Sequence, residues 1–147
     1  MNWVSESKIV FACEKPEHFT KFSHCEECAE HDQTLINSEI DSIGLTELGN
    51  AGWDPICFCS AAGKKYYMPA LIRLSIETLD DLIYFPQLLF HLESDGDNNN
   101  LFSSCSAAQR IFIAKFISYM ITEHTDKIES NNCSNDALRV YEIWSRA

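Results

Sequence analysis

The densest group of metal-binding side chains in the sequence lies between residues 24 and 31. This segment reads HCEECAEH and contains the imidazoles of His24 and His31 and the thiols of Cys25 and Cys28. At about 100° per residue, a helix through the segment would place His24, Cys28 and His31 on one face. Imidazole and thiolate are ligands that zinc prefers, so the spacing indicates three ligands of a zinc site.

The fourth ligand has two sources in the sequence. Cys25 lies within the same segment, and Cys57 and Cys59 flank Phe58 further along the chain. In an extended strand, residues two apart face the same side, so the Cys57 and Cys59 thiols would be presented together. We therefore expect either Cys25 or one of these two thiols to complete the site.

Two other interpretations apply to the same cysteines. Free cysteine is among the residues most often buried, so Cys28 and Leu35 could belong to the core, with His24 and His31 hydrogen-bonded at its margin. A dithiol redox role for Cys25 and Cys28 is disfavoured, because a thioredoxin-type pair follows a strand of a βαβ unit and the preceding residues do not resemble one.

One loop matches part of a calcium-binding motif. Asp95, Asp97 and Asn99 match the first, third and fifth positions of an EF-hand loop, but Asn100 and Ser106 stand where Gly and a bidentate Glu belong. A solvated loop is therefore favoured there. The sequence lacks the GxGxxG, GxxxxGK[ST], GxSxG and HExxH motifs. No nucleophile is tied by such a motif to the scattered histidines.

The charge balance limits the partners. The chain of 147 residues has 22 Asp and Glu against 11 Lys and Arg, a formal net charge of −11. Such a surface repels the phosphate backbone, so we expect no nucleic-acid binding and a basic protein as the natural partner. Residues 111–121 are the most apolar stretch and are too short to cross a membrane. Seven cysteines, an odd number, and the lack of a secretory signal favour the cytoplasm.

The hydrophobic pattern predicts a mainly α single domain over residues 1–147, with a small β-hairpin that makes it formally α+β. The hairpin is expected near residues 56–67, around a turn at residues 61–63. Helices are expected at residues 3–13, 24–37, 45–48, from Pro69 onward, 82–92, 106–123 and 136–145, and loops at residues 94–100 and 125–135.

Particular residues mark some of these helix ends. Ser23 with Glu26 and Ser106 with Gln109 have the spacing of capping boxes. Pro69 suits a first helical turn, because its missing amide would be unpaired there. Pro86 requires the helix over residues 82–92 to begin there or to bend.

Five segments together resemble a family of small uncharacterised bacterial proteins. The HCEECAEH string is the most specific of them, and the resemblance spans roughly residues 9 to 120. It implies a compact bacterial cytosolic domain and supplies no catalytic residues. The segments are PEHFT (16–20), HCEECAEH (24–31), GWDPICF (52–58), YYMPA (66–70) and QLLFHL (87–92).

These observations favour a non-enzymatic acidic protein that binds a basic partner, for example an immunity protein that neutralises a basic toxin. The alternative is a zinc enzyme or zinc-dependent regulator that uses His24, Cys25, Cys28 and His31, with Glu27 or Glu30 as local acid or base. A nucleic-acid mimic that occupies a DNA-binding protein shares the charge argument and differs in its target.

Overall fold

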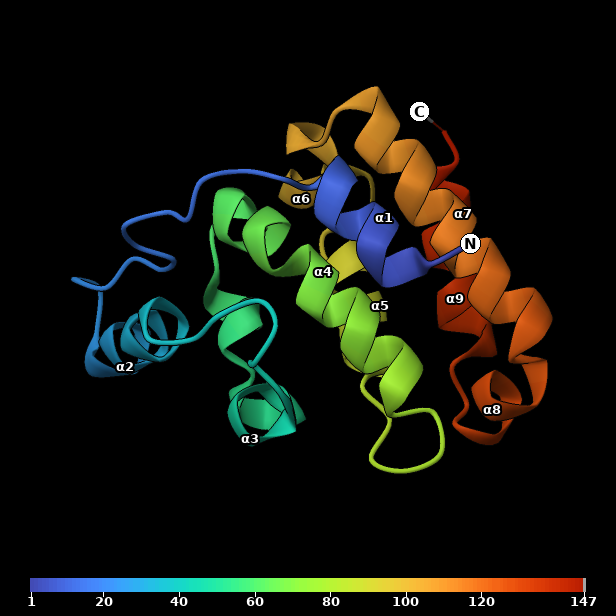
Figure 1. Cartoon of the computed structure of the whole chain (residues 1–147), viewed down its shortest axis with the longest axis horizontal. Coiled ribbons are helices and arrows are strands. Elements are labelled where there is room, and N and C mark those ends of the chain that lie inside the picture. The colour runs from blue at the N-terminus through green and yellow to red at the C-terminus, as the bar shows by residue number, and fades with distance from the viewer. Residues whose placement is uncertain (147) are drawn as a thin grey trace. The chain divides into compact units, whose positions relative to one another are not determined.

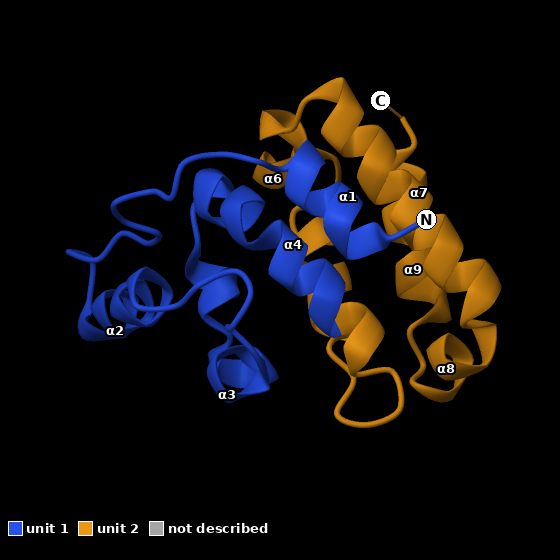
Figure 2. Ribbon diagram, in the orientation of Figure 1, with its two compact units in different colours: residues 1–74 blue, residues 75–147 orange. Residues whose placement is uncertain are grey.

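The computed structural model describes residues 1–146, and every regular element among them is helical (Figure 1). The mainly α prediction is confirmed. The α-helices are α1 (Trp3–Val10), α2 (Glu26–Ile36), α3 (Leu45–Leu48), α4 (Ala61–Glu77), α5 (Phe85–Glu93), α6 (Asn100–Ser104), α7 (Ala107–Glu123), α8 (Thr125–Ser130) and α9 (Ser134–Trp144). Three short 3₁₀ turns are η1 (Ala51–Trp53), η2 (Pro55–Phe58) and η3 (Gly96–Asn98). The chain divides into two compact units, residues 1–74 and 75–147 (Figure 2).

The predicted hairpin over residues 56–67 is wrong, because this segment consists of η2 and the first turns of α4. Two side chains favour helical starts here. The Asp54 carboxylate accepts the amide N–H of Ile56 at 2.9 Å, and the Ser60 hydroxyl accepts that of Gly63 at 3.1 Å. Each bond satisfies an amide that a helix leaves unpaired at its start. The segment that resembles a turn between two strands is therefore the beginning of a helix.

In the first unit, three long side chains hold the connection that follows α2. Lys15 Nζ donates to the carbonyls of Ile36 and Ser38 at 2.8 and 2.7 Å. The buried Tyr67 hydroxyl lies 2.9 Å from the Ser38 carbonyl, and Arg73 donates to two further carbonyls in the same connection. Carbonyls at a helix end have no partner within the helix, so these donors stabilise the exit from α2.

In the second unit, α9 packs against both α5 and α7. The centre of this packing is Trp144, which is fully buried and donates its indole N–H to the Leu92 carbonyl at 2.9 Å. Val140 and Phe116 are also fully buried. Even the apolar α7 falls short of a membrane span, and no helix within residues 1–146 is long and apolar enough to make one.

Two predicted loops and one predicted proline position differ in the structure. The polar segment from residue 125 to 135 contains α8 and the start of α9, because Ile128 and Cys133 are buried and anchor it. The segment from residue 94 to 100 contains η3. Pro69 lies inside α4, eight residues after the helix begins, so burial of this helix outweighs the lost amide bond. Pro86 lies in the first turn of α5, as one of the two alternatives requires.

The two predicted capping boxes have opposite outcomes. Ser106 caps α7, accepting the Gln109 amide at 3.2 Å while Gln109 accepts the Ser106 amide at 2.9 Å, so this prediction is confirmed. Ser23 does not cap α2, whose N-cap is Cys25. The helix consequently begins two residues later than expected, and His24 precedes it.

We expect Ser106→Ala to lower the free energy of unfolding by about 1 kcal/mol, because it removes the hydroxyl that caps α7. Ser23→Ala is the matched control, with an expected change of at most about 0.5 kcal/mol, since Ser23 lies two residues before the N-cap of α2. Urea denaturation followed by circular dichroism measures both. Equal losses in the two variants would contradict the assignment of the caps.

Candidate metal centre at the start of α2

His24, Cys25 and Cys28 form a compact group at the start of α2. The Cys25 and Cys28 sulfur atoms are 3.3 Å apart, and His24 Nδ1 lies 3.7 Å from the Cys28 sulfur. The ligand atoms of the three residues all lie within 4.8 Å of one another. His24 and Cys25 are exposed, whereas Cys28 is half-buried. The group is open to solvent and could hold a metal ion.

The start of α2 shifts the pKa values of the Cys25 and Cys28 thiols in opposite directions. Cys25 is the N-cap, and its sulfur accepts the backbone N–H of Cys28 at 3.4 Å. This backbone bond, together with side-chain bonds from His24 and Cys28, lowers the pKa of Cys25 to about 7. The hydrogen bond with Cys25, followed by partial burial, raises the pKa of Cys28. Of the two thiols, Cys25 therefore loses its proton more readily.

A buried carboxylate holds the loop that leads into this group. Asp32 is 1% exposed, and its Oδ1 accepts the backbone N–H groups of Phe19 and Thr20 at 2.6 and 3.1 Å. The Thr20 hydroxyl donates to the Cys28 carbonyl at 2.6 Å. Burial acts to raise the pKa of Asp32, but the hydrogen bonds from His18, Phe19 and Thr20 outweigh it and the pKa is lowered. Asp32 therefore ties the preceding loop to α2.

The sequence pattern did not single out the pairing of His18 with Asp32. His18 Nδ1 lies 2.7 Å from Asp32 Oδ2, and the imidazole stacks on Phe22 with ring centroids 4.0 Å apart. The His18 side chain is 46% exposed. A carboxylate on one ring nitrogen fixes the imidazole orientation. The one sequence feature that could have indicated this anchor is an acidic residue beside the apolar stripe of Cys28 and Leu35.

His31 lies apart from the group, although the predicted helix face included it. Its ring is 1% exposed and lies between Trp53 and Phe58, with centroids 4.6 Å from each. Its Nε2 is 3.6 Å from Glu27 Oε1, which is beyond a good hydrogen bond. His31 therefore belongs to an aromatic cluster that packs against α2, rather than to the group of His24, Cys25 and Cys28.

Cys57 and Cys59 also lie outside the group that His24, Cys25 and Cys28 form. Cys57 is in η2 and is exposed, and Cys59 follows η2 and is buried. Because no strand forms there, the shared strand face predicted for these two thiols does not exist. Burial holds the pKa of the Cys59 thiol far above its usual range, so Cys59 is a neutral thiol at physiological pH.

The loop that resembles an EF-hand uses its ligand candidates internally. Asn99 is buried, and its amide donates to the carbonyls of His91 and Ser94 at 3.0 and 2.9 Å. Its side-chain oxygen caps α6 by accepting the Phe102 amide at 2.9 Å. Asp97 pairs with Arg146. Two of the three residues that match EF-hand positions, Asp97 and Asn99, are thus already engaged within the protein.

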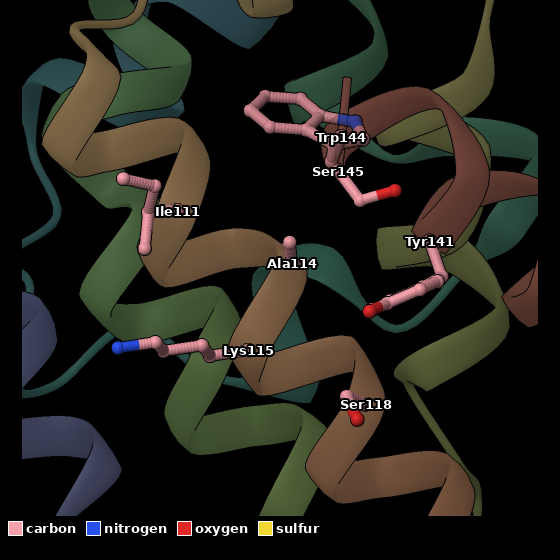
Figure 3. Close-up of a pocket in the computed structure, with 7 residues that line it drawn as sticks. All are labelled: Ile111, Ala114, Lys115, Ser118, Tyr141, Trp144 and Ser145. Carbon is pink, nitrogen blue, oxygen red and sulfur yellow. The ribbon is translucent and has the colours of Figure 1, made fainter. Parts of the chain in front are cut away.

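The second unit contains a hollow of about 300 Å³ between α7 and α9, at the small end of the range for ligand pockets. The Tyr141 side chain points from α9 toward α7, whereas the Lys115 side chain points away from Tyr141 (Figure 3). The lining lacks Cys, His, Asp and Glu, so it supplies neither soft metal ligands nor carboxylates. Lining residues are Ile111, Ala114, Lys115, Ser118, Tyr141, Trp144 and Ser145.

Comparisons of this chain with protein-family models, with curated proteins and with solved structures find no match. Within the described residues of the first unit, the group at the start of α2 combines soft ligands, mutual proximity and exposure.

We expect Asp32→Asn to lower the free energy of unfolding at pH 7 by about 2 kcal/mol, because it weakens hydrogen bonds to a buried charge. The folded-state pKa of Asp32 lies below its unfolded value of about 3.9, so the carboxylate contributes stability above that pH. That contribution is lost as the pH falls further, through the folded-state pKa.

Urea denaturation at several pH values checks this prediction. The difference in the free energy of unfolding between the original protein and Asp32→Asn should stay constant from about pH 5 to 8. It should become smaller below about pH 4. Glu30→Gln, an exposed change on the same helix, is the control and should change stability by less than about 0.5 kcal/mol. A difference that persists unchanged at acid pH would contradict the role given to the carboxylate.

Proposed function

We propose that the protein binds a zinc ion through His24, Cys25 and Cys28. The observation that carries this proposal is that one imidazole nitrogen and two sulfur atoms lie within 4.8 Å of one another on an exposed helix start. Two thiolates and a neutral imidazole balance the charge of a divalent cation. Sulfur and imidazole ligands favour zinc over magnesium or calcium, which prefer oxygen.

The distances in the group are close to those of a zinc site. Zn–S bonds of about 2.3 Å at tetrahedral angles separate two sulfur atoms by about 3.8 Å. The Cys25 and Cys28 sulfur atoms are 3.3 Å apart, so a modest rotation of either side chain would suffice. The distance of 3.7 Å between His24 Nδ1 and the Cys28 sulfur already fits.

Three protein ligands leave a fourth coordination position for water or for a donor from another molecule. Glu27, the nearest candidate for acid–base work, directs its carboxylate toward His31 rather than forming part of the group. This orientation supports a binding or regulatory role in preference to metal-assisted hydrolysis.

We expect the purified protein to bind one zinc ion, with an affinity that increases with pH because the thiols must lose their protons. Cys25→Ser, Cys28→Ser and His24→Ala should each weaken binding by about tenfold or more. Competition with a chromogenic chelator, together with elemental analysis, measures affinity and stoichiometry.

Two further variants control this experiment. Cys13→Ser removes another exposed thiol and should leave the affinity unchanged. Cys57→Ser tests whether that thiol supplies the fourth ligand and should also have no effect. Loss of zinc in Cys57→Ser but not in Cys25→Ser would contradict the proposed ligand set.

A second role, binding a basic protein, is supported by the distribution of carboxylates. Only Asp32 and Asp54 are buried among the 22 acidic residues, all of which the structure describes. Several cations are already paired with carboxylates, including Lys8 with Asp41 and Lys127 with Asp80. The surplus negative charge therefore faces solvent and can attract a cationic surface.

If a basic protein co-purifies with this chain, we expect their affinity to fall at least about tenfold between low and high salt, because exposed charges are screened. Isothermal titration over a salt series measures it. An affinity that does not respond to ionic strength would contradict the electrostatic proposal.

A further inference from the structure

The two thiols at the start of α2 differ from the other cysteines of the chain in their mutual distance. The Cys25 and Cys28 sulfur atoms are 3.3 Å apart, and both thiols are free. Cys59, Cys105 and Cys133 are buried, and Cys13 and Cys57 are exposed. Cys25 and Cys28 therefore combine access to solvent with a neighbouring sulfur atom.

The backbone here can accept a disulfide without rearrangement. Residues three apart at a helix start have Cα atoms about 5 Å apart, from the rise and radius of the helix. Disulfides span Cα distances of roughly 4.4–6.8 Å, with an S–S bond of about 2.05 Å. Closing the sulfur atoms from 3.3 Å thus needs only side-chain rotation.

We propose that Cys25 and Cys28 form a reversible disulfide by exchange with low-molecular-weight disulfides, and that this disulfide and a bound metal ion exclude each other. The exchange stands on the 3.3 Å separation of the two sulfur atoms, although the strand that precedes a thioredoxin-type pair is absent between α1 and α2. The exclusion rests on the zinc-binding function proposed above, because both thiolates are consumed when the disulfide forms.

The exchange proceeds in two balanced steps. The Cys25 sulfur, the more exposed of the two, attacks one sulfur of the small disulfide and forms a mixed disulfide, and the departing thiolate takes up the proton that Cys25 has lost. The Cys28 sulfur then attacks the Cys25 sulfur and releases the second small thiolate, which takes up the proton from Cys28. The protein loses two electrons and the small disulfide gains them as two thiols.

The local charge selects among small disulfides. Residues 17–30 contain four glutamates and one lysine, Lys21, and Glu26 and Glu27 lie between the two cysteines. A cationic disulfide is attracted to this segment and an anionic one is repelled. The substrate class is therefore a small disulfide with positive or zero charge.

The test treats the full chain, freed of metal by a chelator, with cystamine, hydroxyethyl disulfide or glutathione disulfide. We expect the free thiols to decrease by two and peptide mass spectrometry to locate the disulfide between Cys25 and Cys28. At low ionic strength, cystamine should react about threefold or more faster than glutathione disulfide, and high salt should reduce this ratio.

Three variants define the roles of the thiols. Cys28→Ser should stop at the mixed disulfide on Cys25, and Cys25→Ser should slow the reaction of this peptide about tenfold or more, because it removes the attacking sulfur. Cys13→Ser is the control and should behave as the original protein. A disulfide located elsewhere, or equal reaction of Cys13 and Cys25, would overturn the proposal, and faster reaction with glutathione disulfide would overturn its charge selectivity.

Experiments with zinc distinguish the proposed disulfide exchange from the proposed metal binding. Preloading with zinc should block exchange, and a chelator should restore it. Exchange in a protein that does not bind zinc would support the disulfide and refute the metal site. Zinc binding without disulfide formation would refute the disulfide and leave the metal site in place, and exchange that proceeds at saturating zinc would overturn their mutual exclusion.

Discussion

The arrangement at the start of α2 depends on the compensation of one buried negative charge. A carboxylate removed from water is costly unless hydrogen bonds replace its hydration. Asp32 obtains these bonds from the backbone of Phe19 and Thr20 and from the imidazole of His18. The chain that precedes α2 must therefore lie against the helix, and it leads directly into His24 and the N-cap Cys25. The exposed chemical group is thus positioned by a residue that is itself almost inaccessible.

The ligand types could be recognised from sequence, but their arrangement could not. The string HCEECAEH identified four soft ligands, and the structure brings His24, Cys25 and Cys28 together. A shared face for His24, Cys28 and His31 requires a helix that includes His24, whereas α2 begins at Glu26. His31 is on α2, but the rings of Trp53 and Phe58 surround it. That contact joins distant parts of the sequence, and spacing within one segment carries no information about it.

The same distinction between local and distant signals explains the fold. The cap formed by Ser106 and Gln109 is a local interaction, and it was predictable. The segment around Tyr66 and Tyr67 has residues that favour strands, but its conformation is decided by the burial of both rings and by the bond of the Tyr67 hydroxyl to the Leu35 carbonyl at the end of α2. In α8, a polar sequence forms a helix because the buried Ile128 anchors it. Long-range burial thus outweighed local propensity in both segments.

The sulfur at the N-cap of α2 has a spectroscopic consequence. The side-chain atom at a helix N-cap is usually an oxygen. In α2 it is the Cys25 sulfur, which accepts a hydrogen bond from the Cys28 amide proton. The resonance frequency of that proton should move whenever the sulfur gains or loses electron density. One backbone signal, observable by nuclear magnetic resonance without any label on the side chain, thereby reports the chemical state of the whole group.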